Sequence, residues 1–482
     1  MSLLLLVFLF AFVYYVLNSY YKKVRKFNKD QLDGPKPIPV FGNLIQLGDK
    51  PHYTLTEMHK TYGEIFRVWM GDCYSVVVSS PSIIREMYID KFDSFVDRPT
   101  TPSFRFFSAD HRSLSLGNGE YWKRNKTIVA NAMTKTKMKH IYALFDVQVS
   151  ELISSMQSFC DSSQPFPPRR YAQRFTMNSM LKYIFNDQMP PISENQDQQS
   201  RMSKLIEPVE ELFKYLSSAK LADFLDILST PFYYYLSMTN TCLPKIKNFI
   251  REEYNEHLKT IDRENPRDLM DLLICEIGSD TEDIEVVIGV CVDMLAAGTD
   301  TVSGTIEWMM LLMANHPDIQ EKVYNEIHTV IGDRKIELSD RNQTPYTLAL
   351  IKEVVRYHPI GPFGLPRVCT QDVHIQGHFI PKGAQILPNF RGLYQNPKHW
   401  DHPEEFNPIR FIGTKCDAFI PFSVGPRNCV GQTLGWDELY LGISNILQKF
   451  KISSTDGKPI DETELWGLTL HPPLFKVNLQ SR

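Results

Sequence analysis

A ten-residue loop, FSVGPRNCVG at residues 422–431, places a cysteine, Cys429, immediately before an apolar stretch with helical spacing at 432–450. The spacing predicts an amphipathic helix whose N-terminus presents free backbone N–H groups to the loop. Such donors, together with nearby positive charge, favour the thiolate form of cysteine, which is the form that binds metals. The loop therefore predicts a functional thiolate, with a buried cysteine in a glycine-rich turn as the alternative.

Four other residues of the loop suit a flat group that carries a carboxylate. Gly425 permits a tight turn, and Gly431 permits close approach of the backbone to something planar and bulky. Phe422 offers that group an apolar neighbour, and Arg427 offers a fork of donors that matches carboxylate geometry. A thiolate, a planar apolar surface and a carboxylate partner together describe a haem bound through an axial cysteine.

Composition excludes several other classes of protein. The chain has 482 residues, 43 % of them hydrophobic, which is ample for a deep core. Its 52 basic and 56 acidic residues leave a net charge of −4, so nucleic acid is not an expected partner. The eight cysteines show no C-x-x-C pair, which argues against a disulfide framework or a zinc site and favours a reducing compartment.

The N-terminus predicts a membrane anchor. Residues 2–21 carry no charge, and about 20 apolar residues suffice to cross a bilayer as a helix. Basic residues follow this segment, which by the positive-inside rule leaves the rest of the chain in the cytosol. A cleaved signal peptide is the alternative, but it would carry a basic start and a small-residue cleavage site. We therefore expect an anchor helix at 1–21, a basic and proline-rich linker at 22–50, and one large domain at 51–482.

The pattern of that domain is mainly helical with a small β part. Residues 64–80 alternate in polarity around Gly71-Asp72 and predict a β-hairpin, and a second strand-rich region spans 373–387. Most of 121–357 has helical spacing, including a long segment at 281–315 that stops ahead of a proline. We expect an α+β fold of mainly α character.

The spacing F-x-x-G-x-R-x-C-x-G at 422–431 resembles the cysteine motif of the cytochromes P-450, haem-thiolate monooxygenases, and the membrane anchor resembles their eukaryotic microsomal type. This resemblance implies the cytochrome P-450 fold and a haem b cofactor whose iron is bound by Cys429. It also implies a structural charged network of Glu353, Arg356 and Arg410, from TLALIKEVVRYHP at 347–359 and FNPIRF at 406–411.

A second motif, AAGTDTV at 296–302, resembles the oxygen-activation motif of the family. Ala297 and Gly298 would let the helix pass close over the haem, and Asp300 and Thr301 would relay protons during oxygen activation. A helix-packing motif of small residues is the alternative. Val302 replaces the hydroxyl residue that is usual after the threonine, which puts a secondary hydroxyl contribution in doubt.

The haem propionates are assigned by resemblance to Trp122, Lys126, Arg98, Arg367 and Arg427. Lys126 replaces the usual arginine, which keeps the charge but loses bidentate geometry.

The resemblance implies a monooxygenase that inserts one oxygen atom from O2 into a lipophilic small molecule, such as a fatty acid, a sterol or a xenobiotic. Apolar segments such as 104–107 and 361–365 fit such a substrate. The chain has no flavin or nicotinamide fingerprint, so electrons would come from an NADPH-dependent reductase, with cytochrome b5 as a further donor. The expected location is the endoplasmic reticulum membrane, facing the cytosol. A haem-thiolate isomerase acting on peroxides and a non-enzymatic haem sensor remain as alternatives.

Overall fold

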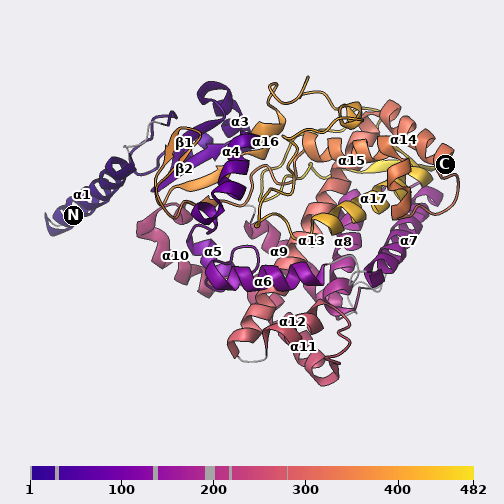
Figure 1. The fold of residues 1–482 in the computed structure, drawn as a ribbon, viewed down its shortest axis with the longest axis horizontal. Helices are drawn as coiled ribbons and strands as arrows, with labels where there is room; N and C mark the ends of the chain where they lie inside the picture. Colours follow the sequence, from indigo (N-terminus) through magenta and orange to yellow (C-terminus); the bar gives the residue numbers. More distant parts are fainter. Residues whose placement is uncertain (1–2, 28–31, 134–138, 190–200, 217–219, 279–280) are drawn as a thin grey trace.

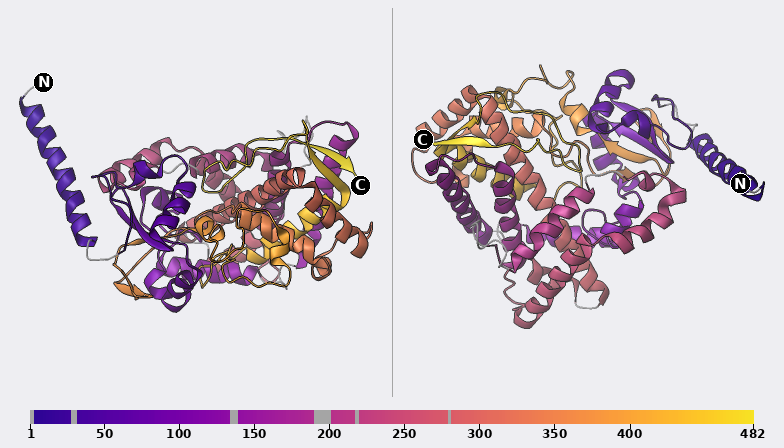
Figure 2. Two further views of the ribbon diagram at one scale, coloured as in Figure 1. Left: turned by 90° about the horizontal axis from the view of Figure 1, so that it is seen from above. Right: turned by 180° about the vertical axis from the view of Figure 1, so that it is seen from behind.

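The computed structural model describes residues 3–27, 32–133, 139–189, 201–216, 220–278 and 281–482. Most helices gather into one body with a small sheet at the edge nearer the N-terminus, and helix α1 projects away from it (Figure 1). Seen from above, α1 and the hairpin at the C-terminus lie at opposite ends of the molecule (Figure 2).

The described α-helices are α1 Leu3–Phe27, α2 Leu44–Leu47, α3 Pro51–Tyr62, α4 Pro81–Arg85, α5 Pro102–Phe107, α6 Gly119–Ala132, α7 Lys139–Asp161, α8 Pro168–Phe185, α9 Ile206–Leu216, α10 Asp226–Thr239, α11 Cys242–Thr260, α12 Leu269–Ile277, α13 Thr281–Asn315, α14 Pro317–Val330, α15 Pro345–Tyr357, α16 Phe390–Tyr394 and α17 Gln432–Lys449. Prolines stand at the first helical position of several of them, where the missing N–H costs no hydrogen bond. The predicted long helix ends at Asn315, because Pro317 begins α14.

Within the described residues, eight strands form three small sheets. They are β1 Ile65–Met70, β2 Cys73–Val78, β3 Arg367–Val368, β4 Val373–Ile375, β5 His378–Ile380, β6 Gln385–Pro388, β7 Phe450–Ser454 and β8 Val477–Ser481. The largest sheet has the order β1-β2-β6-β3, with β1 and β2 antiparallel and β6 parallel to β2. The predicted hairpin is therefore confirmed, with its turn at Gly71-Asp72.

Helix α13 runs through the main hydrophobic core and packs along α8. Among the described helices, the segment Asp283–Asn315 has the length and hydropathy of a membrane span, and 72 % of its apolar window is buried inside the protein. Burial explains this apolar character, because a helix in a protein core is apolar on all sides.

Helix α1 differs in extent from the anchor predicted at 1–21. It continues through the basic residues to Phe27, because its last turns pack against the sheet. Tyr20 and Phe27 are buried there, and the Phe27 ring stacks on Tyr74 with 4.9 Å between ring centroids. Lys23 forms ion pairs with Asp72 and Asp226. The first part of α1 instead leaves large apolar side chains exposed, among them Phe8, Phe10 and Phe12.

Candidate functional site

Cys429 lies in the loop that leads into α17. Its backbone N–H donates to the Phe422 carbonyl at 2.9 Å, which closes the loop on itself. Cys429 is exposed as a residue, although the surrounding protein removes enough solvent from its thiol to raise the pKa of that thiol. A backbone N–H of Gly431 and the charge of Lys126 oppose that rise. The helix N-terminus and a cation therefore act in the direction of the thiolate, although burial outweighs them in this structure.

The two glycines of the loop serve different purposes. Gly425 has φ of +76°, and a Cβ there would lie 1.9 Å from the Tyr88 carbonyl oxygen, so both conformation and space demand glycine. Gly431 has an ordinary φ of −83°, and a Cβ would meet only the Cys429 sulfur and Met133, each at 3.9 Å. Phe422 packs edge-on against Trp436 of α17. The protein itself thus leaves the space beside Gly431 open.

Arg427 is buried and only partly satisfied. One terminal nitrogen donates to the Gly117 carbonyl, and the guanidinium carbon lies 4.3 Å from the centre of the Trp122 ring. Its Nε and its other terminal nitrogen are buried without a hydrogen-bond partner. Burial, and then the charge of Arg367, lower the pKa of Arg427 to about 9, while Asp97 opposes them. Among the described residues, no acceptor pairs with these two nitrogens, so the Arg427 guanidinium can bind an anionic ligand.

Two further arginines converge on the same place. Arg98 donates to the carbonyls of Leu365 at 2.7 Å and Ser115 at 3.1 Å. Burial lowers its pKa, and the charges of Arg427 and Arg367 lower it further. Arg367 lies over the Tyr88 ring at 3.4 Å, and its Nε is buried without a partner. Three buried cations that repel one another indicate a site for a negatively charged ligand.

Lys126 lies nearer to the cysteine loop. It donates to the backbone carbonyl of Asn428 at 2.6 Å, beside Cys429. Burial lowers the pKa of Lys126, and the charge of Cys429 raises it. The structure therefore brings Trp122, Arg98, Arg367 and Arg427 together, and Lys126 lies within electrostatic range of Arg427 while it bonds to the cysteine loop.

The second motif lies on α13. Ala297 is exposed and Thr301 is partly exposed, and the Thr301 hydroxyl donates to the Ala297 carbonyl at 2.9 Å. Gly298 does not share this accessible side, because a Cβ there would lie 2.2 Å from the sulfur of Met180 on α8. The expectation that Gly298 faces the haem is therefore corrected: it allows α8 and α13 to pack closely. Val302 is buried in the core, so a hydroxyl at this position would not reach the accessible side.

Asp300 is buried and held by a loop near the C-terminus. Thr469 donates to one carboxylate oxygen, and Nε2 of His471 lies 3.2 Å from the other. The sequence pattern gave no signal for this contact, because residues 469 and 471 are remote in the chain and lie in an irregular segment.

The network of Glu353, Arg356 and Arg410 is assembled as the resemblance implied. Both Glu353 oxygens accept from Arg356, at 2.7 and 2.8 Å, and one also accepts from Arg410 at 3.1 Å. Arg356 also donates to the carbonyls of Tyr394 and Pro403. Glu353 and Arg356 are fully buried, so the network ties α15 to the segment that precedes the cysteine loop.

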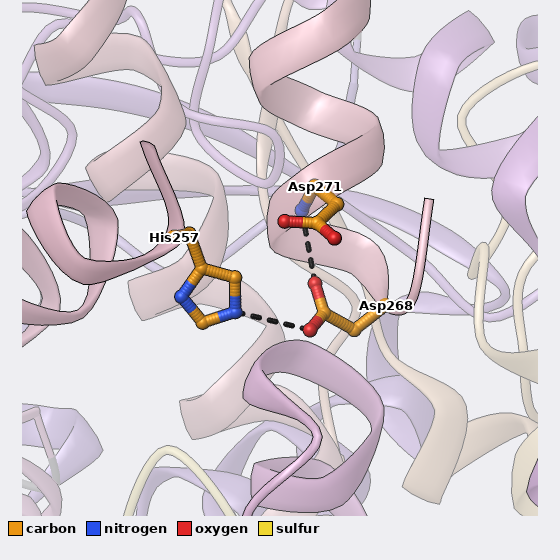
Figure 3. Close-up of side chains that lie close together, drawn as sticks. All are labelled: His257, Asp268 and Asp271. Atoms are coloured by element: carbon orange, nitrogen blue, oxygen red, sulfur yellow. Dashed lines mark hydrogen bonds and ion pairs between the residues drawn. The ribbon is translucent and has the colours of Figure 1, made fainter. Parts of the chain in front are cut away.

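A separate buried cluster of His257, Asp268 and Asp271 has spacing that could hold a metal ion (Figure 3). Its polar atoms already have protein partners. Asp268 caps α12 through the Asp271 N–H and accepts from His257, and Asp271 forms an ion pair with Arg267. The cluster is therefore explained as a helix cap and carries no metal assignment.

Comparison with known proteins identifies the class. A sequence profile of the cytochrome P450 family, written here as P-450, matches residues 32–479. Two probable cytochromes P-450 of Dictyostelium discoideum, 508A1 and 508A2, are 46 % and 42 % identical to this chain, over 98 % and 99 % of both partners. A zebra fish cytochrome P-450 structure with abiraterone has a TM-score of 0.78 and 26 % identity, and the match covers 90 % of this chain and 100 % of the zebra fish chain. This chain belongs to the cytochrome P-450 family of monooxygenases, whose cofactor is a haem with a thiolate ligand.

The residues of the site fit that cofactor. A haem carries two propionates, and the unpaired nitrogens of Arg427 and Arg367 are buried donors suited to carboxylates. The sulfur of Cys429 provides a ligand of the required type. The fit thus depends on buried arginine nitrogens that have no hydrogen-bond partner among the described residues. This feature can be seen only in the folded chain.

Proposed function

We propose that this chain is a membrane-anchored monooxygenase that inserts one oxygen atom from O2 into a lipophilic small molecule, using electrons from NADPH through a reductase. Cys429 would bind the haem iron, and Arg98, Arg367, Arg427 and Trp122 would hold the propionate side. When bound, the haem supplies oxygen binding and cleavage of the O–O bond, which electron donation from the thiolate favours. The protein excludes water, orients the substrate and delivers protons.

The observation that carries this proposal is the pairing of an accessible cysteine with three buried arginines. Buried guanidinium nitrogens without a hydrogen-bond partner are costly, and Arg427 and Arg367 both have them, so a ligand is expected to complete the cluster. Asp300 and Thr301 on α13 supply the proton-relay residues that an oxygenase needs and that a haem carrier does not.

A lipophilic substrate is supported by the aromatic residues of the apolar segments 104–107 and 361–365, which the resemblance assigns to the pocket. Phe104 and Phe106 of α5 and Phe363 after α15 are half-buried. The two similar zebra fish cytochrome P-450 structures are structures with abiraterone and with progesterone, which are lipophilic small molecules. The resemblance also assigns the helical stretch 193–221 to the lining, and its residues 193–200 and 217–219 lie outside the described residues.

The membrane location is supported by α1, whose first part exposes Phe8, Phe10 and Phe12. A helix with such a surface is stable in lipid and costly in water. We propose that it anchors the domain to the endoplasmic reticulum membrane with the domain in the cytosol, where a reductase and cytochrome b5 can reach it.

The first test is the absorption spectrum of the reduced, carbon monoxide-bound protein and of Cys429→Ser. A strongly red-shifted Soret band in the native protein that is lost in the variant is the expected result. Cys416→Ser, in a half-buried cysteine on a neighbouring segment, is the matched control and should keep the band. A native spectrum typical of histidine ligation, or a band that survives in Cys429→Ser, contradicts the assignment.

The second test separates the functional alternatives. With a reductase, NADPH and a panel of fatty acids, sterols and xenobiotics, we expect a product that contains one oxygen atom from ¹⁸O2. Rearrangement of a lipid hydroperoxide without NADPH would instead support an isomerase. Bound haem with no turnover under either condition would support a haem sensor.

A further inference from the structure

One stripe of α13 carries Asp300 of the oxygen-activation motif together with two residues further along the helix. Asp300, Gly304 and Glu307 are spaced i, i+4 and i+7, so they lie on one face of the helix. Two carboxylates are thus separated by a residue without a side chain. The space over Gly304 is filled by Ile360 and the His471 ring, because a Cβ there would lie 2.5 Å from Ile360 Cδ1 and 2.9 Å from His471 Cε1.

Each nitrogen of His471 faces one of these carboxylates. Nε2 lies 3.2 Å from Asp300, and Nδ1 lies 3.6 Å from Glu307. Arg169 of α8 forms an ion pair with the other Glu307 oxygen at 2.8 Å and donates to the Pro472 carbonyl at 2.7 Å. Glu307 is 1 % exposed and His471 17 % exposed, so these charges meet largely out of water.

The backbone on both sides of His471 is fixed. Trp308 Nε1 donates to the Leu470 carbonyl at 2.8 Å, and the Leu470 N–H donates to the Ile360 carbonyl at 2.8 Å. The His471 carbonyl accepts from the Leu465 N–H at 2.8 Å. These backbone hydrogen bonds therefore fix the position of the His471 ring between the two carboxylates.

The charged groups that face this ring are Asp300 and Glu307 from α13, with Arg169 from α8 behind Glu307. A neutral imidazole would leave Asp300 buried without a cation, since its other partner is the Thr469 hydroxyl. Two buried carboxylates with a single arginine would be strongly unfavourable. A charged imidazole balances them.

We propose that His471 is a positioning residue of the oxygenation reaction, which as an imidazolium seated over Gly304 holds the Asp300 side chain in the place from which it relays protons. The proposal rests on the proposed monooxygenase function. Burial lowers the pKa of His471, but hydrogen bonds and charges of Asp300 and Glu307 outweigh it and raise the pKa to about 9. His471 is therefore charged at neutral pH.

The direct test is an NMR titration of the histidine rings in the reduced, carbon monoxide-bound holoprotein, which requires no turnover. His471, assigned by the loss of its signal in His471→Gln, should titrate far above an ordinary histidine. In Asp300→Asn its midpoint should fall by about one pH unit or more. A midpoint of about 6.5, the ordinary value, or no change in Asp300→Asn, would overturn the proposal.

The functional arm measures hydrogen peroxide released per NADPH consumed, with a reductase and without added substrate. His471→Gln should raise the peroxide fraction severalfold at neutral pH, and the native protein should approach that fraction as the pH rises through about 9. Gly304→Ala should act similarly, because its Cβ would crowd both Ile360 and the His471 ring. His328→Gln, an exposed histidine on α14, is the matched control.

A double variant distinguishes positioning from a general structural effect. If His471 acts through Asp300, adding His471→Gln to Asp300→Asn should leave the peroxide fraction unchanged, and His471→Lys should restore a lower fraction by returning the charge. Additive effects of the two changes would overturn the proposal. If no NADPH is consumed at all, the monooxygenase proposal fails, while the NMR titration still decides the contact between His471 and Asp300.

Discussion

At the scale of single residues, Arg427 combines a buried charge with unused donors. Arg427→Met should release haem about tenfold faster or more, because it removes a charge-assisted partner of a propionate, equivalent to at least about 1.4 kcal/mol. Haem transfer from the holoprotein to excess apomyoglobin measures this rate. Lys322→Met, an exposed change on α14, should leave it unaltered. Equal rates in Arg427→Met and the native protein would remove Arg427 from the cofactor site.

Glu438 of α17 is a buried carboxyl whose role is structural. Burial raises its pKa to about 8, against a weaker opposing hydrogen bond from Ser179. Its folded pKa exceeds the unfolded value of 4.5, so its contribution is complete below about pH 4.5 and is lost as the pH rises through about 8. Glu438→Gln should therefore raise the thermal midpoint relative to the native protein more at pH 8.5 than at pH 6. A difference independent of pH would show that Glu438 titrates normally.

At the scale of elements, Glu464 connects the segment that carries Thr469 and His471 to the rest of the protein. Its buried carboxylate lies 2.9 Å from both His358 and Arg391 and 3.3 Å from His52, which come from three different parts of the chain. Glu464→Gln should lower the free energy of unfolding by about 3 kcal/mol, because it leaves the largely buried guanidinium of Arg391 without its anion.

Thermal or urea unfolding of the holoprotein tests this change. Glu404→Gln, at an exposed position, is the matched control and should change the free energy of unfolding by less than about 0.5 kcal/mol. If Glu464→Gln were equally neutral, the segment would be held by its backbone hydrogen bonds alone.

At the scale of the whole molecule, α1 has two parts with different roles. Deletion of residues 2–18 should move the protein from the membrane fraction to the soluble fraction with little change in thermal midpoint. Deletion of residues 2–27 should also lower stability by about 3 kcal/mol, because Tyr20 and Phe27 are buried against the sheet. Membrane sedimentation and thermal unfolding of both variants measure these effects, and equal thermal midpoints would show that the contact of α1 with the sheet is dispensable.

The sequence by itself determined which chemistry this protein carries and where its main elements lie. The cysteine loop, the hairpin at 64–80 and the helix ending before Pro317 are local patterns, and each depends on interactions between near neighbours in the chain. Only the tertiary structure decided that Arg98, Arg367 and Arg427 lie close together. It also decided that Gly298 lets α13 pack closely against α8, and that the His471 ring lies over Gly304. These contacts join segments that are remote in sequence and partly irregular, so their geometry follows from packing rather than from periodicity.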